Sequence, residues 1–153
     1  MVVSLFSCGR LSDSKVDLLL PSSYQLKLDH REGIGIAEVK FYKCEIPNGD
    51  IDSTIINYPA FSPVNEELLI GWHHPSSQEL QNLEEFIKAE LSRDVERLIR
   101  EDYFKDPALL ISYTYDKDEP NLGTKGYNIN SWMTLFLLSP NHREVVYIDY
   151  GKF

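Results

Sequence analysis

The first half of the chain consists of short segments in which apolar and polar positions alternate, a pattern that predicts β-strands. Residues 16–20 form an apolar segment, and residues 24–30 alternate as a half-buried strand does. Residues 33–46 predict a longer strand. Its apolar positions change from one face to the other along the way, which indicates a bulge near Ala37 or Glu38.

Further strands follow, separated by turn residues. Residues 47–50 (Pro-Asn-Gly-Asp) predict a turn, because Asn and Gly adopt positive φ at little cost. Beyond it, the pattern predicts strands at residues 53–58, 67–72, 108–115, 127–138 and 144–150. The last two are joined by a short turn at residues 139–142 and should form an antiparallel hairpin.

One segment between these strands carries a helical pattern. Ser76 and Glu79 have the spacing of a capping box, in which the hydroxyl and the carboxylate each accept a hydrogen bond from a backbone N–H. Apolar residues then recur every three or four positions and form one stripe: Leu80, Leu83, Ile87, Leu91, Val95 and Leu98. The pattern predicts one helix from Ser77 to Tyr103, which Pro107 prevents from continuing.

A run of strands, one long helix and a final group of strands together predict an α+β fold. We expect a twisted, mainly antiparallel sheet with the one long helix packed on one face. The chain of 153 residues is close to the usual size of one domain, and it contains no internal repeat or long linker. Residues 1–153 are therefore expected to form a single domain.

The chain is acidic, with 15 Lys and Arg against 24 Asp and Glu, which gives a formal net charge of −9. Nucleic acids and anionic membranes attract cationic proteins, so this charge disfavours both as partners. It would instead attract a basic protein over a long range. The alternative explanation is that the charge only keeps the protein soluble.

Two cysteines, Cys8 and Cys44, are too few for a disulfide framework, and we expect both to be reduced thiols. No apolar run reaches the roughly 18 residues that a membrane-spanning helix requires. The residues before Cys8 lack the charged and apolar regions of a signal peptide. These features predict a cytoplasmic protein.

Residues that could carry chemistry do not form a recognisable motif. His73 and His74 are adjacent on an extended segment, where neighbouring side chains point to opposite sides and seldom bind one ion together. Cys44 lies within a predicted strand, the usual setting of a structural thiol. No Gly-x-Ser-x-Gly motif and no glycine-rich phosphate motif occurs. We therefore expect no metal, no cofactor and no catalytic residues.

Acidic residues are concentrated on both sides of the strand predicted at residues 108–115. From Glu101 to Glu119 there are more acidic residues than lysines. Carboxylates around aromatic side chains suit a basic, partly apolar partner. The predicted partner-binding residues are Asp102, Asp106, Tyr113, Tyr115, Asp116, Asp118, Glu119 and Tyr127. The competing interpretation is a solvated loop with no binding role.

The C-terminal half contains the segments 108–116 (ALLISYTYD), 132–137 (WMTLFL) and 145–148 (VVYI). In these segments it resembles the immunity proteins of contact-dependent growth inhibition systems. Immunity proteins of this kind are small and acidic, and each blocks a secreted toxin that is encoded beside it. The resemblance therefore implies a non-catalytic inhibitor that binds and neutralises a cognate toxin domain.

Two other functions fit the predicted fold. A small enzyme or ligand-binding domain would use the concave face of the sheet, with His73, His74 or several carboxylates in a closed polar pocket. A single-stranded nucleic-acid binder would stack bases on Tyr and Trp side chains. It would also need a track of basic residues, such as Lys27, Lys40 and Lys43.

Overall fold

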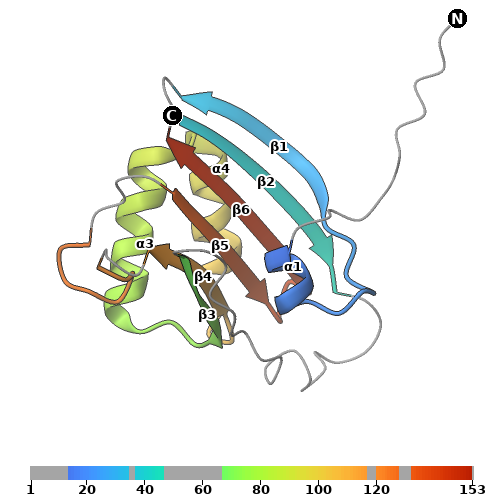
Figure 1. Cartoon of the computed structure of the whole chain (residues 1–153). Helices are drawn as coiled ribbons and strands as arrows, with labels where there is room; N and C mark the ends of the chain where they lie inside the picture. The colour runs from blue at the N-terminus through green and yellow to red at the C-terminus, as the bar shows by residue number, and fades with distance from the viewer. Residues whose placement is uncertain (1–13, 35–36, 47–66, 117–119, 128–131, 153) are drawn as a thin grey trace, which may run out of the picture.

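The computed structural model describes residues 14–34, 37–46, 67–116, 120–127 and 132–152. These residues form a six-stranded antiparallel sheet with helices packed against it (Figure 1). The strand order is β1-β2-β6-β5-β4-β3. The strands are Lys27–Ile34 (β1), Ala37–Glu45 (β2), Glu67–His73 (β3), Leu110–Asp116 (β4), Trp132–Ser139 (β5) and Glu144–Lys152 (β6). The predicted α+β class and the antiparallel sheet are confirmed.

The three C-terminal strands lie next to one another, as the sequence pattern predicted. β4 pairs with β5, and β5 and β6 form the expected antiparallel hairpin. β3 is the strand predicted at residues 67–72, and it lies at one edge of the sheet beside β4. The turn predicted at residues 47–50 and the strand predicted at residues 53–58 lie outside the described residues.

The single long strand predicted at residues 33–46 is wrong, because the chain reverses direction within it. β1 ends at Ile34 and β2 begins at Ala37, and these two residues are partners in the antiparallel pair. The apolar positions change face here because the chain changes direction, so no bulge is needed at this point. A register irregularity does occur earlier in β1, between Leu28 and His30.

The segment predicted as one continuous helix from Ser77 to Tyr103 consists of three elements, so that prediction is wrong. They are the α-helices α3 (Ser77–Glu90) and α4 (Arg93–Leu98) and the π-helical turn η1 (Ile99–Tyr103). The predicted start of the helical segment at Ser77 is confirmed. The N–H of Glu79 donates to Oγ of Ser76, and the N–H of Ser76 donates to Oε2 of Glu79, which completes the capping box.

Ser92 marks the break that the sequence pattern did not reveal. Its backbone is extended (φ −64°, ψ 155°), and it is the N-cap of α4. Its N–H donates to Oε1 of Glu32 in β1 at 3.2 Å, so an edge strand of the sheet holds the start of α4. Leu91, Val95 and Ile99 are buried on both sides of the break. The apolar stripe keeps its period across the break, which is why it predicted one helix.

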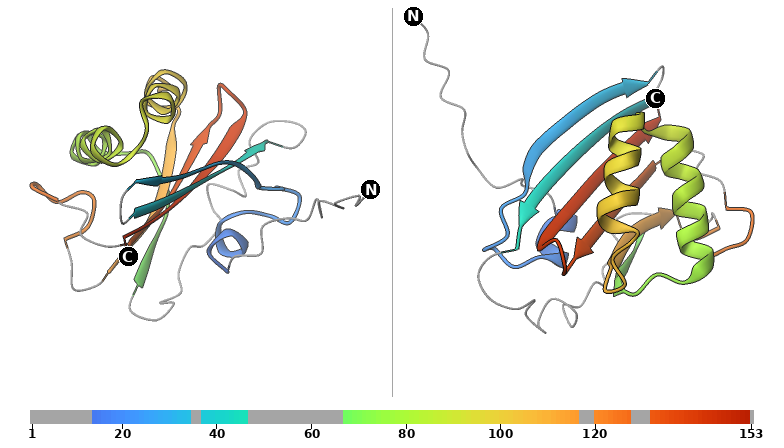
Figure 2. Two further views of the ribbon diagram at one scale, coloured as in Figure 1. Left: turned by 90° about the horizontal axis from the view of Figure 1, so that it is seen from above. Right: turned by 180° about the vertical axis from the view of Figure 1, so that it is seen from behind.

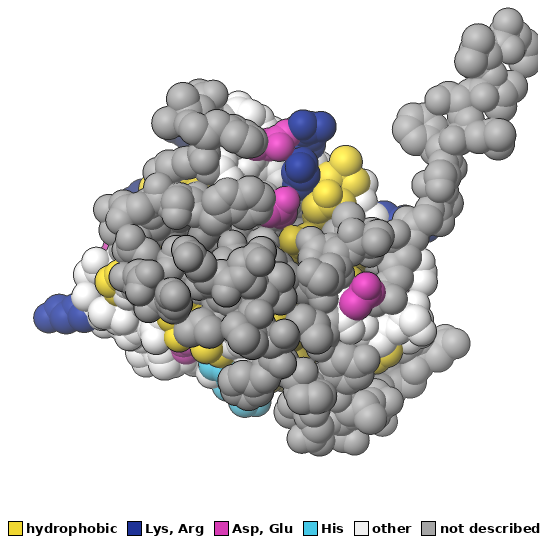
Figure 3. Space-filling model, viewed as in Figure 1, with side chains coloured by type: hydrophobic (Ala, Val, Ile, Leu, Met, Phe, Trp, Pro, Cys, Tyr) yellow, Lys and Arg dark blue, Asp and Glu magenta, His cyan; other side chains and the backbone are white. Residues whose placement is uncertain are grey.

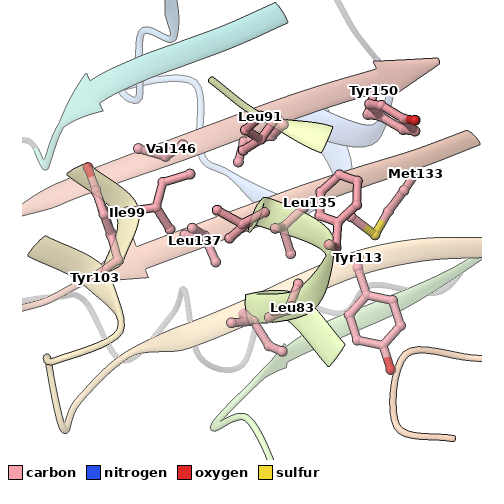
Figure 4. Close-up of a cluster of buried hydrophobic side chains, with 14 of the residues drawn as sticks. Leu83, Leu91, Ile99, Tyr103, Tyr113, Met133, Leu135, Leu137, Val146 and Tyr150 are labelled. Carbon is pink, nitrogen blue, oxygen red and sulfur yellow. The ribbon is translucent and has the colours of Figure 1, made fainter. Parts of the chain in front are cut away.

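Helices lie on both faces of the sheet. α3 and α4 lie side by side on one face, and the short helix α1 (Ser14–Leu19) lies on the other (Figures 1 and 2). Figure 4 shows the core on the α3–α4 side, where Leu83, Ile99 and Leu135 belong to one cluster of buried side chains. No helix in the described part of the chain combines the length and the apolar character needed to cross a bilayer.

The apolar segment at residues 16–20, predicted as a strand, belongs to α1 and the residue after it. Val16, Leu19 and Leu20 are buried, and their spacing of three and four positions places them on one face of a helix. They form a second core with Trp72 of β3, whose indole N–H donates to the carbonyl oxygen of Leu19 at 3.0 Å. The segment was too short for its apolar pattern to distinguish a helix from a strand.

Candidate functional site

The predicted acidic residues lie at two different ends of β4. Asp102 belongs to η1 and Asp106 lies in the connection to β4, whereas Asp116 is the last residue of the strand. The length of β4 separates the two ends by about 20 Å, at roughly 3.3 Å per residue. Asp118 and Glu119 follow Asp116 in the sequence and lie outside the described residues. The described members of the predicted group therefore form two sets.

Asp106 has a structural role at the first of these ends. It is buried, with 6% of its surface exposed. Its carboxylate accepts hydrogen bonds from Oγ of Ser139 at 2.6 Å, the N–H of Ala108 at 2.9 Å and the side-chain amide of Asn141 at 2.6 Å. Burial would raise the pKa of Asp106, but these donors outweigh it and hold the pKa below its ordinary value. Asp106 thus ties the β5–β6 turn to the start of β4.

A second buried carboxylate, Glu79 at the start of α3, joins the helix to β3 and β4. Its Oε1 accepts a hydrogen bond from the hydroxyl of Tyr113 at 2.9 Å and lies 2.9 Å from Nε2 of His73. Burial would raise the pKa of Glu79, but the donors from Ser76 and His73 outweigh it and lower the pKa. Burial and the neighbouring carboxylate raise the pKa of Tyr113. Tyr113 is therefore a core residue whose hydroxyl is already bonded.

Tyr115 and Tyr127 are the predicted aromatic residues that keep part of their surface exposed. Both are half-buried and pack against the core on the α3–α4 side. The ring centroid of Tyr115 lies 6.4 Å from that of Tyr113, and the hydroxyl of Tyr127 contacts Sδ of Met133 at 3.9 Å. Tyr115 directly precedes Asp116 in β4, and consecutive residues of a strand face opposite sides of the sheet, so the ring of Tyr115 belongs to the α3–α4 side.

The register of β3 and β4 adds an acidic position that the sequence analysis missed. Glu67, the first residue of β3, is the Cα partner of Asp116, the last residue of β4. Like charges at directly opposite positions of an antiparallel pair are destabilising. Glu66 precedes Glu67, and Asp118 and Glu119 follow Asp116, so further carboxylates flank both strands in the sequence. We call the opposed positions Glu67 and Asp116 the acidic edge. Only strand pairing reveals it.

A second pair of opposed carboxylates shows how the fold compensates such charges elsewhere. Glu45 and Glu144 are Cα partners in β2 and β6. Nζ of Lys43 lies 3.5 Å from Oε1 of Glu144, and the hydroxyl of Tyr103 donates to Oε2 at 2.6 Å. The sequence next to the acidic edge supplies one cation, Lys117, among several carboxylates. By sequence, the neighbourhood of the acidic edge therefore contains more carboxylates than cations.

Residues 120–127, on the return from β4 to β5, are anchored to α3. The side-chain amide of Asn82 donates to the carbonyl oxygens of Leu122 at 2.6 Å and Thr124 at 2.9 Å. Leu122 is itself buried. The amide of Gln78 donates to Oδ1 of Asn82 at 3.1 Å, which fixes the orientation of the Asn82 side chain. The segment that follows the acidic edge therefore has a fixed attachment point on the helix.

The two adjacent histidines have separate partners. His73 contacts Glu79, and Nδ1 of His74 contacts the carbonyl oxygen of Leu109 at 3.0 Å. Among the residues that the structure describes, no group of three or more His, Cys, Asp or Glu side chains is placed to hold a metal ion. Hydrophobic cores occupy both faces of the sheet. A ligand-binding domain of the kind considered above would need one of these faces for its pocket.

The three lysines considered for nucleic-acid binding are interspersed with carboxylates. Lys27 and Lys43 are Cα partners in β1 and β2 and line a hollow of about 720 Å³ together with Glu144. Nζ of Lys40 lies 3.4 Å from Oε2 of Glu38. On the face viewed in Figure 3, acidic and basic side chains are likewise mixed. These lysines do not form a uniformly basic track.

Comparison with known proteins found no matching family model, no matching curated protein and no matching solved structure. The resemblance to immunity proteins of contact-dependent growth inhibition systems therefore stays a prediction.

Proposed function

We propose that this protein is a non-catalytic inhibitor of the immunity-protein kind, which binds a basic toxin domain through the acidic edge. The observation that carries the proposal is the opposition of Glu67 and Asp116 at an outer strand pair of the sheet. From the general rule for like charges in such a pair, we expect these two carboxylates to reduce the stability of the free protein. A cationic side chain of a partner would remove that repulsion on binding, so the positions are better suited to the complex than to the free state.

The net charge of −9 favours the same class of partner, because it attracts a basic protein from a distance and speeds the encounter. Charged groups at the rim of an interface contribute little affinity, which comes mainly from aromatic anchors. Tyr115 and Tyr127, both half-buried on the α3–α4 side of the sheet, supply aromatic surface for this purpose. The anchoring of residues 120–127 by Asn82 lowers the entropy that binding must remove.

Such an inhibitor needs no reaction of its own. A toxin that acts on nucleic acid carries a basic surface for its substrate, and an acidic protein bound there excludes the substrate. The acidic edge is expected to speed the encounter and to select a basic partner, and the aromatic surface is expected to supply most of the affinity.

The direct experiment uses the product of a neighbouring gene, if that product is a basic toxin domain. We expect the two purified proteins to form a complex with a Kd of about 1–100 nM that weakens as salt is added, because screening reduces charge attraction. Co-expression of this protein should also protect cells from the toxin. The absence of both binding at low salt and protection in cells would overturn the proposal.

A further inference from the structure

A groove runs between α3 and the α4–η1 segment, the helices that lie side by side in Figure 2. Its volume is about 480 Å³, within the range of small-molecule sites. Arg93, Arg97, Arg100 and Lys105 line it, together with the ring of Phe104. Three of the six arginines of this acidic chain thus gather at one groove.

These basic residues follow one line along the helical segment. The three arginines are separated by four and three positions, the spacing of neighbours on one helix face. Lys105 follows Arg100 by five positions, which would move it off that line in an α-helix. In η1 the N–H of Phe104 donates to the carbonyl oxygen of Ile99 at 3.1 Å, a bond that spans five residues. The π-helical turn therefore keeps Lys105 beside the arginines, and such turns are frequent at functional sites.

Much of the positive charge in the groove is available to a ligand. Arg93 and Lys105 have no ion-pair partner among the described residues. Arg97 and Arg100 pair only with carboxylates of their own helical segment, at 3.7 and 3.2 Å, and both guanidinium groups are mostly exposed. Exposed pairs of this kind are weak, so an incoming anion can replace the carboxylate.

Carboxylates in the same groove limit what it can hold. Glu84, Glu96 and Glu101 also line it. A long polyanion such as nucleic acid would be repelled by these side chains and by the net charge of −9. A compact anion that contacts two or three neighbouring guanidinium groups avoids most of this repulsion.

We propose that the groove binds a small phosphate-bearing ligand. The guanidinium group presents N–H donors in a planar fork that matches the oxygens of a phosphate, whereas a lysine acts only as a point charge. Phe104 is half-buried next to these donors and offers apolar contact to the rest of the ligand. The residues involved are separate from the acidic edge, so this site does not depend on toxin binding.

The test is a titration of the ¹⁵N-labelled full chain with pyrophosphate at constant ionic strength, followed by NMR. We expect saturable shifts that are confined to the backbone amides near Glu84 and of residues 93–105, and to the Nε–H groups of Arg93, Arg97 and Arg100. The double variant Arg93→Gln/Arg97→Gln should weaken binding at least about tenfold, the effect expected from loss of charge-assisted hydrogen bonds. Lys125→Gln, which removes an exposed cation from the segment at residues 120–127, should leave the affinity unchanged.

Three results would overturn the proposal. One is the absence of saturation, or shifts that sodium chloride reproduces. Another is equal affinity in the double variant and the unaltered protein, with circular dichroism confirming that both are folded. The third is citrate binding as tightly as pyrophosphate, because the site would then select negative charge and not phosphate.

Discussion

The hydroxyl of Tyr113 in β4 donates a hydrogen bond of 2.9 Å to Oε1 of Glu79 in α3. The same carboxylate contacts His73 in β3, and its other oxygen accepts from the N–H of Ser76. One buried side chain thus fixes the start of α3 over the two strands that form the acidic edge. The contribution of the hydrogen bond between Tyr113 and Glu79 can be measured through the stability of the protein.

Replacing Tyr113 with phenylalanine tests this contact, because it removes the hydroxyl and keeps the ring in the core. We expect the free energy of unfolding to fall by about 1.5–3 kcal/mol, the range for hydrogen bonds to charged groups. Urea denaturation followed by circular dichroism measures the change. Tyr115→Phe is the matched control, with an expected change within about 0.5 kcal/mol. Equal losses in the two variants would show that the contact with Glu79 adds no stability.

Acid should destabilise the protein through Glu79 and Asp106, whose pKa values are both lowered in the folded state. The unfolded chain then binds more protons, so this stability is present above the unfolded pKa values of about 4 and is lost as pH falls through the folded values. We expect a plateau in stability above about pH 5 and a decline below it. Asp106→Asn should be less stable at neutral pH and should show a shallower decline. An unchanged slope would assign the acid sensitivity to other groups.

Three tyrosines should resist ionisation while the protein is folded. The hydroxyls of Tyr103, Tyr113 and Tyr150 donate to the carboxylates of Glu144, Glu79 and Glu90, respectively. Burial and these carboxylates raise the pKa of all three. Ultraviolet absorbance at about pH 11, one unit above the ordinary tyrosine pKa, should show incomplete ionisation of the nine tyrosines. The missing signal should appear on unfolding. Complete ionisation of the folded protein would contradict this expectation.

Asn82→Ala should loosen the segment at residues 120–127. Loss of the hydrogen bonds to Leu122 and Thr124 should lower local stability by about 1–3 kcal/mol. Hydrogen exchange of the amide of Thr124 should then become at least about tenfold faster, since 1.4 kcal/mol corresponds to a factor of ten. Gln81→Ala, an exposed change on the same helix, is the control and should leave exchange in this segment unchanged.

The sequence pattern predicted elements wherever the local signal was unambiguous. The capping box of Ser76 and Glu79 placed the start of α3, and apolar periodicity placed β3, β4 and β6 to within two residues. β5 begins at Trp132, whereas the predicted strand began at residue 127. The break at Ser92 could not be predicted, because it depends on an interaction with Glu32 that lies 60 residues earlier. Residues 16–20 fit a short strand and a short helix equally well.

The candidate site was predicted less completely, for a related reason. Asp116 was identified from the local concentration of charge, but its partner Glu67 lies far away in the sequence and is brought opposite by strand register. Asp106 and Tyr113 were grouped with it by proximity in sequence. Their burial and their hydrogen bonds to Ser139 and Glu79 arise only from tertiary packing.

Removing the repulsion at the acidic edge should stabilise the free protein. We expect Glu67→Gln and Asp116→Asn each to raise the free energy of unfolding by about 0.2–1 kcal/mol. The double variant should be only slightly more stable than either single variant, because one substitution already removes the like-charge pair. Glu45→Gln should raise the free energy of unfolding by less, because Lys43 and Tyr103 already compensate the charge of Glu144. Strict additivity of the two single effects would mean that Glu67 and Asp116 do not interact.

The affinity of the Glu67→Gln variant for a basic toxin domain encoded by a neighbouring gene tests the proposed function most directly. At low salt we expect the Kd to rise by about tenfold relative to the unaltered protein, and at high salt we expect the difference to shrink as charges are screened. Glu45→Gln should bind as the unaltered protein does. If Glu67→Gln keeps full affinity at low salt, or loses no more than Glu45→Gln does, the acidic edge is not the surface that binds the partner.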